Sequence, residues 1–252
     1  MRPCVLVFSG LDPSGGAGIQ ADIEAIAAQG AHALPIVTAL TVQDNERVHE
    51  VVPVNAGLLE RQVAALADSM PIRAVKIGIP GNLANAETIA RLVLRLRARQ
   101  AGLPVVLDPV LASGRGDLLA RGNAQASLAP LLPLATVLVP NLREAMALSA
   151  PGCANVLVTG GHAEGDEVVN RWVSKAGMRE WRWPRLDGEF HGSGCTLASA
   201  IAASLALGEP VERALEQAQR YCHQTLADAY AIAPGQRIPG RIRHHAHVEE
   251  TA

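Results

Sequence analysis

Residues 4–30 read CVLVFSGLDPSGGAGIQADIEAIAAQG, and they predict a strand, a loop and a helix in direct succession. The nearly continuous apolar run at 4–10 is typical of a strand buried on both faces of a sheet, and it ends at a glycine. Isoleucines at helical spacing in residues 18–30 predict an amphipathic helix, with Gly30 as its stop signal. A strand that passes through a glycine-rich loop into a helix indicates an α/β fold.

The same alternation continues along the chain. Apolar, β-branched runs predict further strands at 33–42, 74–79, 104–110, 136–141 and 155–161. Helical spacing predicts helices at 57–68, 86–100 and about 120–129, and two more that close the chain at 195–207 and about 210–232. Buried strands separated by helices predict an α/β domain with a central, mostly parallel sheet that is covered on both faces.

One region departs from this pattern. Residues 166–174 and 178–186 alternate polar and apolar side chains and hold all three tryptophans of the chain. Such alternation is typical of strands with one solvated face. We therefore expect an antiparallel hairpin at one edge of the sheet.

The chain has 252 residues, which is enough for one large domain with a sizeable core. No internal repeat or linker divides it, so we expect a single domain over residues 1–235. Residues 236–252 are polar and poorly patterned, and we expect a flexible tail there. The tail holds His244, His245 and His247, which are either metal ligands or part of a solvated segment.

Composition excludes several classes of function. The formal net charge is −2, so no basic surplus indicates binding to nucleic acid or to an anionic membrane. The N-terminus lacks a signal-peptide layout, and no apolar run reaches the ~18 residues of a membrane span. The four cysteines lie far apart without a CxxC pair, which favours a reduced, cytoplasmic protein.

Polar residues gather where the predicted strands end. The strands run into SGLDPSGG (residues 9–16), DPVLASGRG (108–116), PNLREA (140–145) and TGGHAEGD (159–166). Ligands of open α/β sheets bind beyond the carboxyl ends of the strands. We therefore expect the functional site at this edge.

The segment HGSGC, residues 191–195, precedes the small-residue helix near the end of the chain. A helix that begins near Gly194 or Cys195 leaves its first N–H groups without partners, and glycines let the backbone approach a ligand. This pattern predicts an anion hole for a phosphate, and a helix N-terminus lowers the pKa of a cysteine thiol. The alternative is a tight turn followed by an inert core cysteine. Walker A and GxGxxG motifs are both absent.

Seven motifs together resemble one family. They are GLDPSGGAGIQAD (residues 10–22), VTALTVQ (37–43), VKIG (75–78), DPVLASG (108–114), PNLREA (140–145), GGH (160–162) and HGSGCTLASAIA (191–202). Their order over roughly residues 4–230 resembles the hydroxymethylpyrimidine/phosphomethylpyrimidine kinases of thiamine biosynthesis, in the ribokinase superfamily. The resemblance implies a ribokinase-like three-layer α/β/α sandwich. It also implies two ATP-dependent phosphorylations, first of 4-amino-5-hydroxymethyl-2-methylpyrimidine and then of its monophosphate.

The resemblance also implies roles for individual residues. Gly10, Asp22 and Gln43 would hold the pyrimidine, and the Gln43 amide offers the donors and acceptor that suit an aminopyrimidine edge. Cys195 would be the catalytic base, at the place where most of the superfamily has an aspartate. The anion hole would consist of the N–H groups of Gly192, Ser193, Gly194 and Cys195. An exposed strand end is the alternative for Gln43.

Binding of ATP and Mg²⁺ follows from the same resemblance. Asn141 and Glu144 match an NxxE motif associated with Mg²⁺, which usually acts through water. Asp108 would help to hold the metal–phosphate complex, and Thr159 would lie at the ATP phosphates. The alternatives are a solvated first-turn residue for Glu144 and a turn former before Pro109 for Asp108. Lys76 belongs either to the site or to a structural ion pair with a carboxylate.

Departures from the family leave other functions open. Thr159 stands where many members have lysine, and only residues 151–154 lie where members usually have a further helix. A pyridoxine-type vitamin kinase is one alternative, and a non-catalytic pyrimidine-sensing protein is another. The resemblance also implies a homodimer.

Overall fold

The computed structural model describes residues 1–112, 124–148 and 152–242. Its strands are β1 (Cys4–Leu11), β2 (His32–Gln43), β3 (Val48–Pro53), β4 (Ile72–Ile77), β5 (Val105–Leu107), β6 (Val137–Leu138), β7 (Asn155–Val158), β8 (Glu167–Ser174) and β9 (Gly177–Pro184). Its helices are α1 (Gly18–Ala28), α2 (Ala56–Ala67), α3 (Leu83–Arg99), α4 (Ala124–Leu128), the short 3₁₀ helix η1 (Leu132–Leu134), α5 (Leu142–Ala147), α6 (Ser193–Ala206) and α7 (Val211–Ala227). Each predicted strand and helix has a counterpart, although β5, β6, β7 and α7 are shorter than predicted. Residues 120–123 of the helix predicted at about 120–129 lie outside the described residues.

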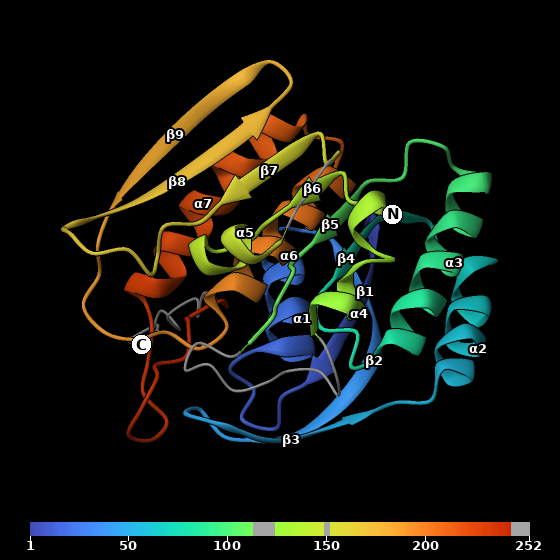
Figure 1. Ribbon diagram of the computed structural model, residues 1–252, viewed down its shortest axis with the longest axis horizontal. Coiled ribbons are helices and arrows are strands. Elements are labelled where there is room, and N and C mark those ends of the chain that lie inside the picture. Colours follow the sequence, from blue (N-terminus) through green and yellow to red (C-terminus); the bar gives the residue numbers. More distant parts are fainter. Residues whose placement is uncertain (113–123, 149–151, 243–252) are drawn as a thin grey trace, which may run out of the picture.

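All nine of these strands form one sheet, in the order β3-β2-β1-β4-β5-β6-β7-β8-β9. The six strands from β2 to β7 in this order are parallel, and β8 and β9 form the antiparallel hairpin predicted for one edge. Figure 1 shows this hairpin at one end of the sheet and β3 at the other. Strand β3 pairs antiparallel with β2 and was not predicted. The sheet therefore has an antiparallel strand at both edges.

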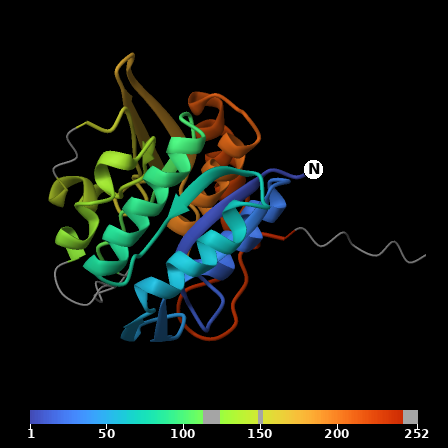
Figure 2. The same ribbon diagram turned by 90° about the vertical axis from the view of Figure 1, so that its right-hand side faces the viewer.

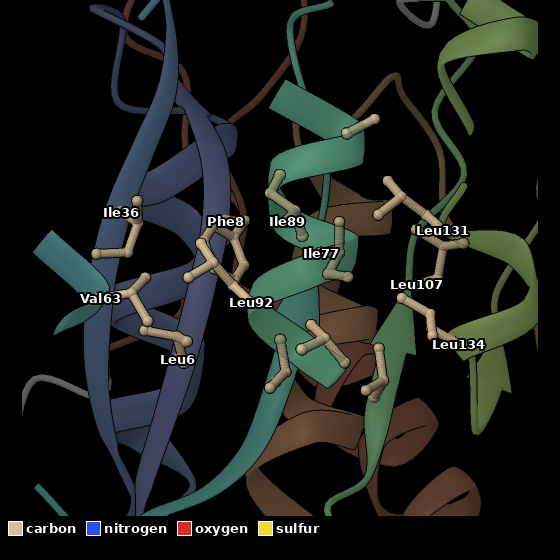
Figure 3. Packing of buried hydrophobic residues seen from close by; sticks show 14 of the residues in the cluster. Leu6, Phe8, Ile36, Val63, Ile77, Ile89, Leu92, Leu107, Leu131 and Leu134 are labelled. Atoms are coloured by element: carbon tan, nitrogen blue, oxygen red, sulfur yellow. The ribbon is translucent and has the colours of Figure 1, made fainter. Parts of the chain in front are cut away.

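Alternation of side chains along the strands gives the sheet two apolar faces. In β1, Leu6 and Phe8 belong to one buried cluster, and Val5 and Val7 belong to the other. Helices α2 and α3 cover the first face and lie side by side in Figure 2. Figure 3 shows Phe8 and Ile77 of the sheet beneath α3. Helices α1, α6 and α7 cover the second face, which completes the predicted three layers.

Helix α6 is buried on most of its surface because it lies between the sheet, α1 and α7. Its sequence, SGCTLASAIAASLA, supplies alanine at nearly every second position, and all of these alanines are buried. Small side chains let the helix approach the sheet and its neighbouring helices closely. This packing fixes the position of the α6 N-terminus, where the predicted anion hole lies.

The C-terminal segment differs from the prediction. Residues 229–242, here called the C-terminal strap, run back across the molecule, with Ile238 3% and Arg241 2% exposed. Backbone bridges join Tyr230 to Ile238 and Phe190 to Arg237. The expectation of a flexible tail is therefore wrong for residues 236–242, because two of these side chains complete buried contacts. His244, His245 and His247 lie outside the described residues.

Candidate active site

The chain places its candidate site at a topological switch point. From β1 the chain passes to β2 on one side, and then returns to β4 on the other side of β1. A cavity of about 740 Å³ opens beyond the carboxyl ends of these strands. It is lined by all but one of the predicted site residues: Gly10, Gln43, Asp108, Asn141, Glu144, Thr159, Gly192, Ser193, Gly194 and Cys195.

The predicted anion hole is formed by the first turn of α6. Gly192 is the N-cap residue and has a φ of 78°, in the left-handed region that favours glycine. A Cβ atom there would lie 2.2 Å from the carbonyl oxygen of Gly16, so a side chain would push two loops apart. The Thr196 N–H is the donor to the Gly192 oxygen, at 2.9 Å. The N–H groups of Ser193, Gly194 and Cys195 precede that bond and are available to a ligand.

Cys195 is half-buried beneath this turn. Burial raises the pKa of its thiol to about 12, and the negative charges of Asp22 and Asp108 add to this effect. The positive charge of Lys76 and a hydrogen bond from the Gly18 N–H favour the thiolate but do not outweigh burial. The expectation of a lowered pKa is therefore wrong, because it considered the helix N-terminus without the desolvation and the carboxylates. The thiol is neutral at physiological pH.

Asp22 is the one predicted residue that does not line the cavity. It is fully buried on α1, and its Oδ1 lies 2.8 Å from Nζ of Lys76, which is also fully buried. The Ser199 hydroxyl donates to the same Oδ1 at 2.6 Å. The structure thus places Asp22 in an ion pair behind the residues that line the cavity. Of the two alternatives for Lys76, the structural partner is correct.

The Lys76 ammonium nevertheless acts on the site through its charge. Burial alone would lower the pKa of Lys76, but the carboxylate of Asp22 and the groups of Cys195 and Asp108 together raise it. Lys76 is therefore a permanent cation next to two cavity-lining groups. Its charge opposes the effect of burial on both Cys195 and Asp108.

Asp108 and Glu144 are buried carboxylates at the cavity edge. Burial raises the pKa of Asp108 to about 6, although Lys76 opposes it. Burial raises the pKa of Glu144 to about 7, and the charge of Asp108 adds to this. Glu144 is 6% exposed, so the alternative of a solvated helix residue is wrong. Asp108 accepts a hydrogen bond from the Cys195 thiol.

The NxxE motif forms a capping box on α5. The Asn141 side chain accepts the Glu144 N–H at 2.9 Å, and the Glu144 carboxylate accepts the Asn141 N–H at 2.9 Å. Its other oxygen accepts the Leu111 N–H at 3.3 Å. These bonds hold the Glu144 carboxylate in place, close enough to Asp108 for the charge of Asp108 to raise its pKa.

The donor set at this edge fits Mg²⁺ held through water. Oδ2 of Asp108 is buried and has no hydrogen-bond partner in the described part of the chain. A divalent cation beside Asp108 and Glu144 would favour the ionised form of both carboxylates, which burial disfavours. Residues 1–112, 124–148 and 152–242 contain no group of three or more His, Cys, Asp or Glu that would enclose a metal directly. Such an arrangement suits Mg²⁺, which keeps most of its waters.

Three further predicted residues lie around the same cavity. Gln43 ends β2, and its Nε2 lies 3.5 Å from Nε2 of His191. A Cβ at Gly10 would lie 2.6 Å from Cδ1 of Ile79, so glycine permits close packing at the end of β1. Thr159, directly after β7, forms a backbone bridge to Asn141, the N-cap residue of α5. The structure thus brings the predicted pyrimidine and phosphate residues to one edge of the sheet.

Sequence reasoning missed the pair formed by Asp12 and His191. Oδ2 of Asp12 lies 2.7 Å from Nε2 of His191, and both residues line the cavity. Asp12 also accepts the N–H groups of Ser14 and Ala17, each at 2.8 Å. It therefore joins the loop before α1 to the loop before α6. The signal was present, because both residues belong to the motifs quoted above.

This pair predicts a pH-dependent contribution to stability. Burial opposes ionisation of Asp12, but the bonds from His191 and Ser14 outweigh it and lower the pKa to about 2. An ordinary Asp titrates near ~3.9, so ionised Asp12 stabilises the fold above that pH and loses this effect as pH falls towards 2. We expect the stability difference between wild type and Asp12→Asn to shrink by about 1 kcal/mol from pH 6 to pH 3. Urea unfolding at both pH values measures it, and a difference that does not change with pH would contradict the assignment.

The fold is shared with a class of solved enzymes, the vitamin kinases. The pyridoxal kinase of Bacillus subtilis, solved as an ADP complex, superposes with a TM-score of 0.86. The match covers 96% of this chain and 98% of that chain at 25% sequence identity. The chain therefore has the fold of the ribokinase-like vitamin kinases.

The chain belongs to the phosphomethylpyrimidine kinase family, whose model matches residues 12–239. The hydroxymethylpyrimidine/phosphomethylpyrimidine kinase of Rhizobium meliloti is 35% identical over 268 residues, 98% of this chain and 98% of that protein. The thiamine biosynthesis multifunctional protein ThiED of Corynebacterium efficiens is 33% identical and matches 97% of this chain, which corresponds to 35% of that longer protein. The family and the fold predicted from the motifs are confirmed.

Proposed function

We propose that this protein is an ATP-dependent kinase that phosphorylates 4-amino-5-hydroxymethyl-2-methylpyrimidine and then its monophosphate in thiamine biosynthesis. The observation that carries the proposal is the α6 N-terminus. Its first-turn residues Ser193, Gly194 and Cys195, whose N–H groups have no partner within the helix, line the same cavity as Gly10 and Gln43. A hydroxymethyl group held between them would face a phosphate held by these N–H groups.

The pyrimidine side of the cavity has suitable chemistry. Gln43 offers two donors and an acceptor, which match the ring nitrogen and amino group of an aminopyrimidine. The neighbouring His191 is held by Asp12, so its ring orientation is fixed. Gly10 lets Ile79 pack closely against the end of β1, and both residues line the cavity where the ring would bind.

Proton transfer would involve Cys195 and Asp108 together. Because the thiol is neutral, Cys195 accepts the proton of the substrate hydroxyl as its own proton passes to Asp108, to which it is hydrogen-bonded. The alkoxide oxygen then forms the bond to the γ-phosphorus of ATP, and the bond to the ADP oxygen breaks. Phosphoryl transfer is mostly positioning and charge neutralisation, so no further covalent step by the protein is needed.

Charge neutralisation would come from the anion hole, Lys76 and Mg²⁺. Mg²⁺ held through water by Asp108 and Glu144 would neutralise charge on the ATP phosphates. Asn141 and Thr159 lie at the same strand ends and would contact those phosphates. The family's lysine is absent at position 159, which increases the dependence on Mg²⁺ and on the N–H groups of α6.

A pyridoxal-type vitamin kinase is the second candidate. It is favoured by the TM-score of 0.86 with the Bacillus subtilis pyridoxal kinase, although the identity of 25% is below the 35% shared with the Rhizobium meliloti pyrimidine kinase. The two substrates both present a hydroxymethyl group on a flat nitrogen ring, so the same phosphate site serves either.

The deciding experiment is ADP formation from Mg-ATP with the pyrimidine, with pyridoxal, and with neither. We expect pyrimidine-dependent turnover in the range of ordinary enzymes, about 1–10³ s⁻¹. Faster turnover of pyridoxal would replace the first candidate with the second. Binding of the pyrimidine without ADP formation would contradict both and favour a sensor protein.

The state of the protein in the cell is also part of the proposal. We propose a homodimer, supported by exposed apolar side chains on the β2–β3 edge, namely Leu40, Val42 and Val52. We also propose that it works in the cytoplasm, which suits its four free cysteines. None of the helices in the described ranges is long and apolar enough to cross a membrane.

A further inference from the structure

Arg241 has the largest fully buried side chain of the described residues, and it lies in the C-terminal strap. A buried guanidinium is costly unless it is paired and hydrogen-bonded. Its Nη1 lies 3.2 Å from Oε2 of Glu24 on α1, which supplies the opposite charge. Its remaining donors bind backbone oxygens and one hydroxyl group at the candidate site.

These donors bind the loops in front of α1 and α6. Nη2 donates to the carbonyl oxygen of Gly16 and, at 3.4 Å, to that of His191. Nε donates to Oγ1 of Thr196 at 2.8 Å, and that hydroxyl donates to the Gly192 oxygen at 2.8 Å. One side chain therefore holds three carbonyl groups, two directly and one through a hydroxyl.

Peptide planarity links these carbonyl groups to the site. In a trans peptide the C=O and the N–H point in opposite directions. Holding the Gly16 oxygen directs the Ala17 N–H towards Asp12, which it reaches at 2.8 Å. Holding the Gly192 oxygen likewise directs the Ser193 N–H away from Arg241, towards the cavity that Ser193 lines.

We infer that Arg241 is a positioning residue for phosphoryl transfer: it fixes the peptide groups of both glycine loops so that the anion hole is formed before ATP binds. The planar guanidinium supplies several donors in a fixed arrangement, which a lysine does not. The strap carries it there through backbone bonds, from the Arg237 N–H to Glu189 and from the His191 N–H to Arg237. The kinetic test of this inference rests on the proposed function, whereas the binding test is independent of it.

The first test compares Arg241→Ala with Tyr221→Phe. The Tyr221 hydroxyl donates to the backbone oxygen of Arg241 at 3.1 Å, so Tyr221→Phe loosens the same segment and leaves the guanidinium contacts in place. We expect Arg241→Ala to lower kcat about 100-fold, the effect of displacing reacting groups by about 1 Å. The KM for the pyrimidine should stay within about threefold of the wild-type value. Tyr221→Phe is expected to keep the wild-type kcat.

The second test needs no kinase activity. We expect titration calorimetry with inorganic pyrophosphate to show at least ~10-fold weaker binding to Arg241→Ala than to wild type. Millimolar guanidinium chloride is expected to restore both kcat and pyrophosphate affinity, while equal sodium chloride restores neither. A wild type without turnover would defeat the proposed function, and the pyrophosphate result would still decide the role of Arg241.

Three outcomes would overturn the inference. The first is a folded Arg241→Ala with kcat and pyrophosphate affinity close to wild type. The second is an equal loss in Tyr221→Phe with no rescue by guanidinium, which would leave Arg241 a purely structural anchor. If Arg241→Ala does not fold, Arg241→Lys replaces it in the same assays. The third outcome that would overturn the inference is a wild-type kcat and a wild-type pyrophosphate affinity in Arg241→Lys.

Discussion

Replacing Cys195 with alanine is expected to lower kcat about 10²- to 10⁴-fold while binding of the pyrimidine stays within a few-fold of wild type. The thiol lies at the first turn of α6 and is hydrogen-bonded to Asp108, so alanine removes the group between the substrate hydroxyl and that carboxylate. The pyrimidine is proposed to bind through Gly10 and Gln43, which alanine does not disturb. Steady-state ADP formation and calorimetric titration with the pyrimidine measure the two effects separately.

Cys153→Ala is the matched control for this experiment. Its Sγ contacts the carbonyl oxygens of Ala135 and Asn155, away from the residues that line the cavity. It therefore loses a thiol of similar chemistry without touching the site, and kcat should not change. If Cys195→Ala instead retained kcat within about fivefold, the general-acid/base contribution would be absent and Asp108 would have to accept the proton directly.

The pH profile distinguishes the proton relay from a resident thiolate. Burial raises the pKa of Cys195 to about 12 and that of Asp108 to about 6. In a relay the wild-type kcat rises with pH through the titration of Asp108, which Mg²⁺ beside it would move to lower pH, and then levels off. If the Cys195 thiolate itself were the base, kcat would instead keep rising with pH into the alkaline range, where the thiol loses its proton.

Much of the fold could be predicted because its signals are local. The apolar run at 4–10 and the isoleucine spacing at 18–30 specified β1 and α1, and both exist where predicted. The glycine at 192 is likewise a local requirement, since it needs a positive φ at the start of α6. Strand β3 was missed because VHEVVP has only a weak pattern, and its pairing with β2 creates the strand.

The electrostatics of the site could not be predicted, because they depend on residues distant in sequence. Helix-terminus reasoning gave the wrong direction for the Cys195 pKa, since the burial and the two carboxylates arise only in the folded chain. Arg241 shows the same limit. The segment around it looks like a polar tail, and its partner Glu24 lies 217 residues away in sequence. A charged residue in an otherwise polar stretch carries no signal that it will be buried.

The ion pair of Asp22 with Lys76 could not be predicted for a related reason. A conspicuous acidic residue within the SGGAGIQAD motif suggested a ligand contact. The spacing of α1 instead turns Asp22 towards the sheet, where Lys76 at β4 neutralises it. A motif shared by a family thus includes residues that build the site from behind as well as residues that touch the substrate.

Replacing Lys76 with methionine is expected to lower the free energy of unfolding by about 3–5 kcal/mol, because Asp22 is left as a buried, uncompensated charge. Both partners of this pair are fully buried at 2.8 Å, and Oδ2 of Asp22 has no hydrogen-bond partner among the described residues. Methionine keeps the length and volume of lysine, so the loss measures charge more than packing. Urea unfolding at pH 7 measures it.

Arg99→Met is the matched surface control. Arg99 pairs with Asp68 at the same distance of 2.8 Å, but these side chains are 65% and 77% exposed. An exposed pair contributes at most about 1 kcal/mol, so Arg99→Met should leave the unfolding free energy nearly unchanged. Equal losses in the two variants would show that burial of the Lys76 pair is not the cause.

The double variant Lys76→Met/Asp22→Leu separates the structural role of the pair from its electrostatic role. Replacing both charges with apolar groups removes the uncompensated charge, so most of the lost stability should return. The kcat should stay low, because the loss of the Lys76 charge, which opposes the effect of burial on Cys195 and Asp108, outweighs the loss of the opposite, smaller effect of Asp22. Recovery of stability together with wild-type kcat would show that Lys76 only balances Asp22. Recovery of stability with a kcat that stays low would show that Lys76 also supplies the site with the positive charge that proton transfer from the substrate requires.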